Sequence, residues 1–243
     1  MLDSGLFESQ VRGETTWSSE EYVEVRNAVP HDILFSFDAP TEPRTKRRSP
    51  VKTAGKPASD RDPPLVSIVH GTDRASIVDG VRSALRAGQS LGIAIADRES
   101  GPDLAARTRT VAVVRNVINV TDETLLLHVL GCGNPVVMAA YTLAGADTFD
   151  SLDWAQGAVD IRSLTLTDPL LLRSTGCKCK VCLDLPGPDN QLALLHNLLF
   201  YQEFSQQLRE MVRSETLTDF LQEFIGEHRA AVLTGTLKDA SSG

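Results

Sequence analysis

Three cysteines and a histidine constrain the C-terminal part of this chain more than any other feature of its sequence. Cys177, Cys179 and Cys182 lie within one six-residue stretch, and His196 follows near the start of an apolar helical pattern. Three thiolates and one imidazole are the donors of a closed tetrahedral zinc site. The spacing therefore predicts a structural Cys3His zinc site. A disulfide and ordinary buried cysteines are the alternatives.

The charges next to the cysteines also favour metal binding. Lys178 and Lys180 alternate with the cysteines, and nearby cations favour thiolate over thiol. Four protein ligands leave no open coordination position, so we expect this zinc to hold structure rather than to carry out chemistry. The reacting groups are then expected elsewhere in the chain.

Length and charge restrict the class of protein. With 243 residues the chain can bury a large core, as one α/β barrel or as two small domains. It has no run of about 18 apolar residues and no basic-then-apolar N-terminus, so we expect a cytoplasmic protein with no membrane partner. The formal net charge of -8 argues against a protein that coats nucleic acid, although a local basic patch could still bind a phosphate backbone.

Short apolar runs that end in a polar residue or glycine recur along the first two thirds of the chain. Their starts are roughly 20 to 35 residues apart, with helical patterns between them, which indicates βα units. The predicted strands are Met1-Leu2 before Asp3, Ile33–Phe37 before Asp38, Leu65–Val69 before His70, Gly92–Ala96 before Asp97, Leu125–Leu130 before Gly131, and Thr148-Phe149 before Asp150.

Apolar spacing and characteristic end residues place helices between and after these strands. Serine, aspartate and asparagine are good N-caps, proline suits the first helical position, and glycine often ends a helix. The predicted helices start after Ser18, cover residues 73–87, run from Pro135 to Gly145, cover residues 191–212, and run from Thr216 to Ile225.

The position of the polar residues favours a TIM-type (β/α) barrel over a doubly wound sheet. In a barrel, the reacting groups follow different strands and meet at one rim. Each residue alone is equally consistent with a helix cap or a loop carboxylate, but five together favour an acidic active-site rim. The five are Asp3, Asp38, His70, Asp97 and Asp150. A Rossmann site would need a third glycine after Gly131 and Gly133, so this segment is interpreted as a strand-to-helix turn.

An ordered series of short motifs extends from Asp3 to about residue 212. It comprises Asp3-Ser4-Gly5, Phe37-Asp38, Ile68-Val69-His70-Gly71, Gly131-x-Gly133-x-Pro135, the segment from Gly145 to Asp150, Cys177-x-Cys179-x2-Cys182, and His196-Asn197-Leu198. In this order the motifs resemble those of the tRNA-guanine transglycosylase (queuine/archaeosine tRNA-ribosyltransferase) family. The zinc cluster and the Gly-Ala-Asp-x-Phe-Asp segment carry the resemblance most strongly.

The resemblance implies exchange of guanine for a 7-deazaguanine base in a nucleic acid, tRNA in the first instance. Asp150 would attack C1′ of the ribose and form a covalent intermediate, and Asp3 would act as general base on the incoming base. A carboxylate nucleophile divides one difficult displacement into two easier steps. The positions expected to bind substrate are Asp38, His70, Asp97 and Gly131. A structural zinc ion and a homodimer are also implied.

The chain departs from the family pattern in the base pocket. The departures are Asp38-Ala39-Pro40 for Asp-Glu-Cys, Val69-His70-Gly71 for Val-Gln-Gly, and Ala96-Asp97-Arg98 for Gly-Gly-Leu. Residues 151–157 replace an arginine-rich segment, which makes DNA an alternative substrate to tRNA. A non-catalytic partner subunit and an enzyme acting on small nucleosides are further alternatives.

The predicted domain organisation follows from these segments. Residues 1–165 form a partial barrel of about six of the eight strands, with a basic, proline-rich loop at 41–64. Residues 166–231 form a zinc-binding helical subdomain, and residues 232–243 form a flexible tail. Six strands cannot close an eight-stranded barrel, so we expect exposed edges at the first and last strands.

Overall fold

A parallel sheet forms the centre of the protein in the computed structural model, which describes residues 18–37, 64–88 and 90–241. The five strands lie in chain order, β1-β2-β3-β4-β5. Their bounds are Leu34–Phe35, Leu65–Val69, Ser90–Ala96, Leu126–Leu130 and Thr148–Phe149. Each connection thus leads to the adjacent parallel strand, as in a (β/α) barrel. The predicted α/β fold is confirmed as a half-barrel, and the strand predicted at Met1-Leu2 lies outside the described residues.

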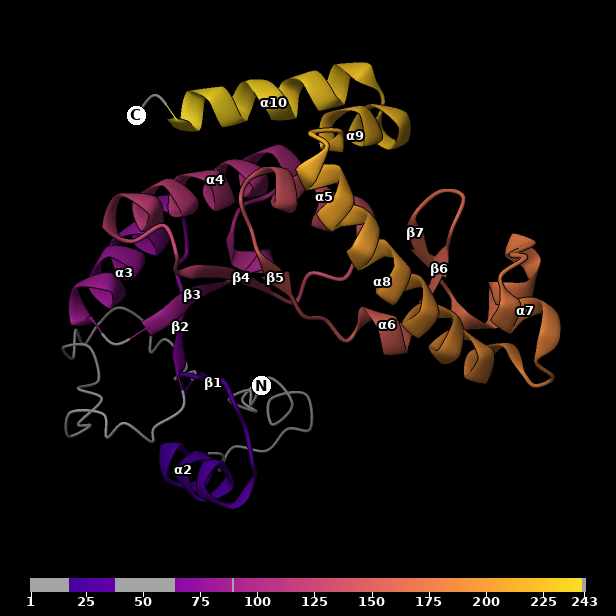
Figure 1. Cartoon of the computed structure of the whole chain (residues 1–243), viewed down its shortest axis with the longest axis horizontal. Helices are drawn as coiled ribbons and strands as arrows, with labels where there is room; N and C mark the ends of the chain where they lie inside the picture. The colour runs from indigo at the N-terminus through magenta and orange to yellow at the C-terminus, as the bar shows by residue number, and fades with distance from the viewer. Residues whose placement is uncertain (1–17, 38–63, 89, 242–243) are drawn as a thin grey trace.

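The helices α3 (Arg74–Ala87), α4 (Leu104–Thr121) and α5 (Pro135–Leu143) connect the strands from β2 to β5 and cover the outer face of the sheet. The helix α2 (Ser19–Ala28) precedes β1. In Figure 1, α3 and α4 lie along one side of the sheet. Ile93 and Ile95 of β3 are fully buried, in one cluster with Val114 and Ile118 of α4. Burying this apolar face accounts for most of the driving force for folding.

The helix starts predicted from capping residues are confirmed. The Ser18 hydroxyl accepts a hydrogen bond from the Glu21 amide, and the Glu21 carboxylate binds back to the Ser18 amide. Asp73 caps α3 in the same way. Asn134 caps α5 by accepting from the amides of Val136 and Val137. Each cap satisfies amides that the first helical turn leaves without partners.

The inner face of the half-barrel is smaller and is built from every second residue of the strands. Phe35, Val66 and Ala94 form a buried cluster there. His128 of β4 pairs in register with Ala94 of β3, and its ring lies against that of Phe35 with centroids 5.0 Å apart. A histidine therefore occupies the interior of the half-barrel, where side chains alternate with those that face the helices.

The C-terminal part contains a small hairpin and several helices. They are α6 (Asp153–Gln156), β6 (Ala158–Asp160), β7 (Thr165–Thr167), η2 (Pro169–Thr175), α7 (Lys180–Asp184), α8 (Asp189–Arg213), α9 (Leu217–Ile225) and α10 (Glu227–Ser241). The helices predicted at 191–212 and 216–225 are confirmed as α8 and α9. The hairpin of β6 and β7 spans residue 165, where the sequence places a domain boundary, and this boundary remains a prediction.

The flexible tail predicted from residue 232 onward is wrong as far as Ser241. These residues continue α10, which lies along the outer side of α4 (Figure 1). Leu233 and Ala240 are buried, and the Asn116 side chain of α4 donates to the Ala240 carbonyl at 2.8 Å. The apolar residues of α10 do not form a strong stripe along one side of the helix, so packing against α4 stabilises a helix whose own pattern is weak. No helix in the described ranges is long and apolar enough to cross a membrane.

Substitution of Gly92 with alanine should destabilise the sheet by about 1–3 kcal/mol, because core overpacking has this cost. A Cβ at Gly92 would lie 2.5 Å from the Leu126 carbonyl oxygen of the neighbouring strand. Urea unfolding measures the change. Gly235→Ala is the control: no atom lies within 4 Å of its added Cβ, and a helix interior gains up to about 1 kcal/mol from this change. Equal midpoints for Gly92→Ala and the wild type would contradict this packing.

Candidate active site and metal centre

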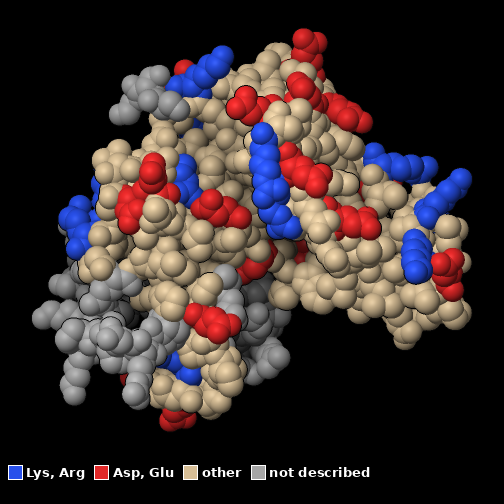
Figure 2. Space-filling model, in the orientation of Figure 1, with Lys and Arg blue, Asp and Glu red and all other residues tan. Residues whose placement is uncertain are grey.

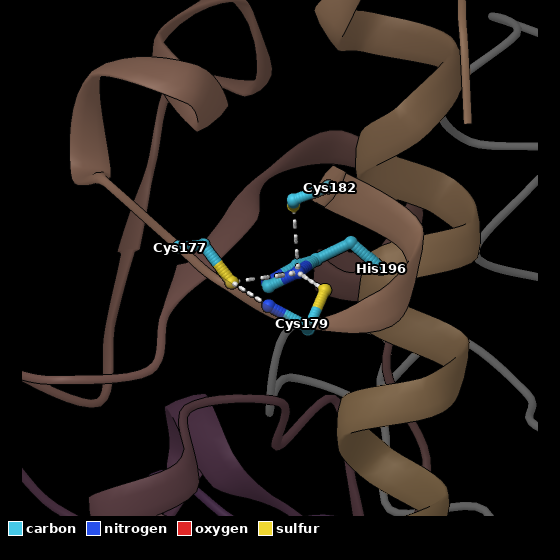
Figure 3. Close-up of side chains that lie close together, drawn as sticks. All are labelled: Cys177, Cys179, Cys182 and His196. Carbon is cyan, nitrogen blue, oxygen red and sulfur yellow. Dashed lines mark hydrogen bonds between the residues drawn. The ribbon is translucent and has the colours of Figure 1, made fainter. Parts of the chain in front are cut away.

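The four predicted metal ligands converge on one point (Figure 3). The His196 Nδ1 atom lies 3.3 Å from the Cys179 sulfur, 3.6 Å from that of Cys182 and 3.7 Å from that of Cys177. A tetrahedral zinc ion with ordinary bond lengths separates sulfur from nitrogen by about 3.6 Å. The three cysteines are free thiols rather than a disulfide. The donor types and their spacing therefore fit a structural zinc ion.

The protein also fixes the orientation of the histidine ligand. His196 is only 1% exposed, and its Nε2 atom lies 2.8 Å from the Val159 carbonyl oxygen in β6. With Nε2–H donating to this carbonyl, the Nδ1 lone pair is directed at the thiols. This is the usual way in which a protein selects the tautomer of a histidine that binds a metal.

Asn197, the next residue of α8, connects the metal centre to the end of the barrel sheet. Its side-chain amide donates to the carbonyls of Trp154 and Gly157, each at 2.7 Å. Its side-chain oxygen accepts from the Val159 amide at 3.0 Å. All three partners lie in the segment that follows Asp150, so two neighbouring residues, His196 and Asn197, connect the cysteine cluster to this segment.

Asp150 follows β5 and is held by groups from β4 and its loop. Its Oδ1 atom accepts from the Gly131 amide at 2.7 Å, and its Oδ2 atom lies 3.6 Å from Nε2 of His128. Burial favours the neutral acid, but the His128 imidazole and the Gly131 amide outweigh it, so the pKa of Asp150 is lowered from its ordinary 3.8. Because its side chain remains 45% exposed, Asp150 is an accessible anion at neutral pH.

A hollow of about 350 Å3 opens beside Asp150. Apolar and aromatic side chains form most of its wall, with Asp150 as the ionised group. The lining residues are Cys132, Gly133, Met138, Phe149, Asp150, Ser151, Trp154, Leu198, Tyr201 and Ser205. An apolar hollow with few polar groups is suited to a flat heterocyclic ring. The Tyr201 hydroxyl donates to the Gly133 carbonyl and fixes one side of the hollow.

Of the other predicted site residues, Asp97 is bound to partners within the protein. Arg107 donates to its Oδ2 atom at 3.0 Å, and the Tyr141 hydroxyl donates to Oδ1. Its charge is therefore balanced before any ligand arrives. Asp3 and Asp38 lie outside the described residues.

His70 forms an ion pair with a residue that the sequence analysis does not single out. Its Nδ1 atom lies 2.9 Å from Oε2 of Glu99, which also accepts from the Gly71 amide at 3.2 Å. Burial opposes ionisation of Glu99, but His70 and the Gly71 amide lower its pKa from the ordinary 4.5. The structure thus brings together Asp150 with Gly131, and His70 with Glu99.

Glu99, His128 and Arg107 gain their roles only through contacts with other elements of the fold, and no local motif marks them. His128 in particular stands in an apolar strand, where its only signal is an ionisable residue at a buried position. On the face shown in Figure 2, acidic and basic side chains are interspersed rather than gathered into one basic stripe. The basic segment predicted at 41–64 lies outside the described residues except for Pro64.

These features place the protein in a structural class: a (β/α)-barrel protein with a helical subdomain that carries a Cys3His cluster after the last strand. Within that class, the sequence matches one family. The model of the family described as queuine tRNA-ribosyltransferase matches residues 3–230, and the chain therefore belongs to this family.

Individual relatives are similar at low identity over most of the chain. The tRNA-guanine(15) transglycosylase of Methanococcus aeolicus is 24% identical over 94% of the chain, which covers 39% of that protein. Those of Archaeoglobus fulgidus and Methanopyrus kandleri are 23% and 25% identical over 94% and 95% of the chain, which covers 52% and 55% of them. The chain thus spans about half the length of the curated relatives it matches.

The purified protein should contain zinc bound by the cysteine cluster. Cys179→Ser should lose the metal on dialysis and lower the thermal unfolding midpoint, because metal binding free energy contributes directly to folding. Elemental analysis and a thermal melt provide the measurements. Cys132→Ala is the matched control, since Cys132 is buried outside the cluster. Full zinc content in Cys179→Ser would contradict the assignment.

Glu99→Gln should alter how stability depends on pH. Since the folded pKa of Glu99 is lowered, its stabilisation is present above its ordinary pKa of 4.5 and is lost as the pH falls through the lowered value. The difference in unfolding midpoint between the wild type and Glu99→Gln should therefore shrink below about pH 4.5. Asp79→Asn, at an exposed helical pair with Arg82, should follow the wild type. A difference that stays constant from pH 7 to pH 3 would contradict the ion pair.

Proposed function

We propose that this protein is a tRNA-guanine transglycosylase that replaces guanine with a 7-deazaguanine base through a covalent aspartyl intermediate. The observation that carries the proposal is the Asp150 carboxylate, which is stabilised as an anion at the end of a barrel strand beside an apolar hollow. Membership of the family supports the reaction class. The names of the relatives, tRNA-guanine(15) transglycosylases, support tRNA as the nucleic acid.

In the proposed first step, an Asp150 oxygen forms a bond to C1′ of the ribose while the bond from C1′ to N9 of guanine breaks. Guanine leaves with that electron pair and takes up a proton. In the second step, the incoming base loses a proton, attacks C1′ and releases the Asp150 carboxylate. We assign removal of this proton to Asp3, which lies outside the described residues. One proton is taken up and one released, so the exchange is balanced.

Ionisation of Asp150 is the physical requirement of the first step, because a protonated carboxyl is a poor nucleophile. The Gly131 amide and the His128 ring supply this condition. The proposed role of zinc is to hold α7 and α8, and through Asn197 to hold the segment that follows Asp150. No step of the exchange passes through the metal.

The base-binding positions are proposed from the family resemblance, and the structure supports them unequally. Asp38, outside the described residues, would accept from N–H groups of a guanine-type ring. His70 and Gly131 lie at strand ends, as this role requires. Asp97 is supported least, because Arg107 and Tyr141 already bind its two oxygens.

We also propose a cytoplasmic homodimer whose contact includes the metal-binding subdomain. Two leucines of α7 and α8 support this surface: Leu183 and Leu195 are 65% and 48% exposed. Exposed apolar side chains that cluster on one subdomain are typical of contacts between proteins.

Asp150→Asn should abolish both base exchange and a covalent protein–nucleic acid adduct. Removal of a nucleophile lowers the rate at least about a thousandfold. Incorporation of labelled guanine into tRNA measures exchange, and a denaturing gel of protein mixed with tRNA before any incoming base is added detects the adduct. Asp153→Asn, three residues further along, is the matched control and should retain both.

The outcomes separate the proposed function from its alternatives. An adduct that survives Asp150→Asn would reject the assigned nucleophile. Exchange with DNA but not with tRNA would move the function to DNA modification. Folded, zinc-loaded protein that reacts with neither would reject the enzyme and favour a partner subunit.

A further inference from the structure

A buried histidine on the inner face of the half-barrel points at the proposed nucleophile. We propose that His128 is a positioning residue for Asp150: its Nε2 proton faces the carboxylate, holds it as an anion and fixes its direction at the end of β5. This inference rests on the proposed function and deepens it, because it names the group that prepares Asp150 for attack.

Three neighbouring strands fix the position of the His128 ring. It is 2% exposed, and it pairs in register with Ala94 of β3 and with Thr148 of β5. Phe35 of β1 packs against the ring at 5.0 Å with an interplanar angle of 60°. A ring enclosed in this way has little rotational freedom, so its nitrogens keep fixed directions.

The two ring nitrogens face different partners. Nε2 lies 3.6 Å from Oδ2 of Asp150 and has no hydrogen-bond partner among the described groups, although it is buried. A lone pair directed at a carboxylate would be repelled, so Nε2 carries a proton. A shift of a few tenths of an ångström would complete a hydrogen bond and remove the cost of an unsatisfied buried donor.

Thr148 explains how the proton is kept on Nε2. Its hydroxyl oxygen lies 2.8 Å from Nδ1 of His128. By donating to Nδ1, the hydroxyl selects the neutral tautomer that carries its proton on Nε2. Thr148 thus orients His128, and His128 in turn orients Asp150. Thr148 lies in β5 and Asp150 directly follows this strand.

The other ionisable groups near this end of the sheet are mostly acidic. Asp97 after β3, Asp153 on α6 and Asp150 itself all disfavour a thiolate at Cys132, which follows β4. Asp147, at the opposite end of β5, is paired with Arg115. Burial opposes a charge on Asp150, so the contribution of His128 and the Gly131 amide decides its state.

The consequence is a shift in the pH at which Asp150 becomes protonated. His128 is among the groups that lower the pKa of Asp150 against the effect of burial. Without His128 the carboxyl would take up a proton at higher pH, and any activity that needs the anion would be lost at correspondingly higher pH.

Carboxyl carbon NMR of protein labelled at aspartate tests this directly, with Asp150→Asn to assign the signal. The titration midpoint of Asp150 should rise by about one pH unit in His128→Leu. It should rise less in His128→Gln, whose amide reaches the Nε2 position. His128→Asn, whose shorter amide reaches only toward Thr148, should behave like His128→Leu.

Kinetics provide a second readout. In the pH profile of the exchange rate, the pH at which activity is lost on the acidic side should rise together with the titration midpoint. His128→Leu should have a lower kcat and an unchanged KM. His128→Gln should restore part of the rate. A midpoint unchanged in folded His128→Leu would overturn the proposal. Should that variant not fold, equal midpoints in His128→Gln and His128→Asn would overturn it.

The NMR experiment needs no turnover, so the two proposals fail separately. A shifted midpoint in a protein that exchanges no base would leave His128 as a positioning residue and reject the transglycosylase function. Base exchange by the wild type, together with an unchanged Asp150 midpoint in His128→Leu, would support the transglycosylase function and reject His128 as a positioning residue.

Discussion

The contacts made by His196 and Asn197 of α8 join the two functional regions of the protein. His196 lies against the three cysteine sulfurs and the Val159 carbonyl of β6, and Asn197 binds the backbone of Trp154, Gly157 and Val159. Both side chains are almost completely buried. These directional hydrogen bonds hold the segment after Asp150 where the sheet ends. The metal site thus stabilises the surroundings of the proposed nucleophile from a distance.

The parallel sheet supplies the other half of the arrangement. Because its strands lie in chain order, residues that follow different strands meet at one edge, and those on the inner face meet inside the half-barrel. Asp150 is at the edge and His128 is inside, one directly behind the other. A single fold principle therefore accounts for both the exposed carboxylate and the buried group that supports it.

Local features of the sequence predict most of the fold, and non-local contacts account for what it misses. Caps such as Ser18 and Asp73 and the cluster of Cys177, Cys179 and Cys182 act over a few residues, so their consequences can be inferred directly. The helices α4 and α10 depend on each other, since neither has a strong apolar stripe. Likewise, the pairing of His70 with Glu99 joins two strand ends 29 positions apart. Such partners become visible only when the sheet register is known.

The agreement between strand order and chain order has a consequence for biosynthesis. Each new strand of the described sheet finds its neighbour already made, so the sheet grows from one side as the polypeptide leaves the ribosome. Asp150 emerges well before residues 196 and 197, which later clamp the loop that follows it. The Cys3His cluster can assemble only after His196 has been translated, so the loop after Asp150 is fixed only when the part of the chain that holds it has been made.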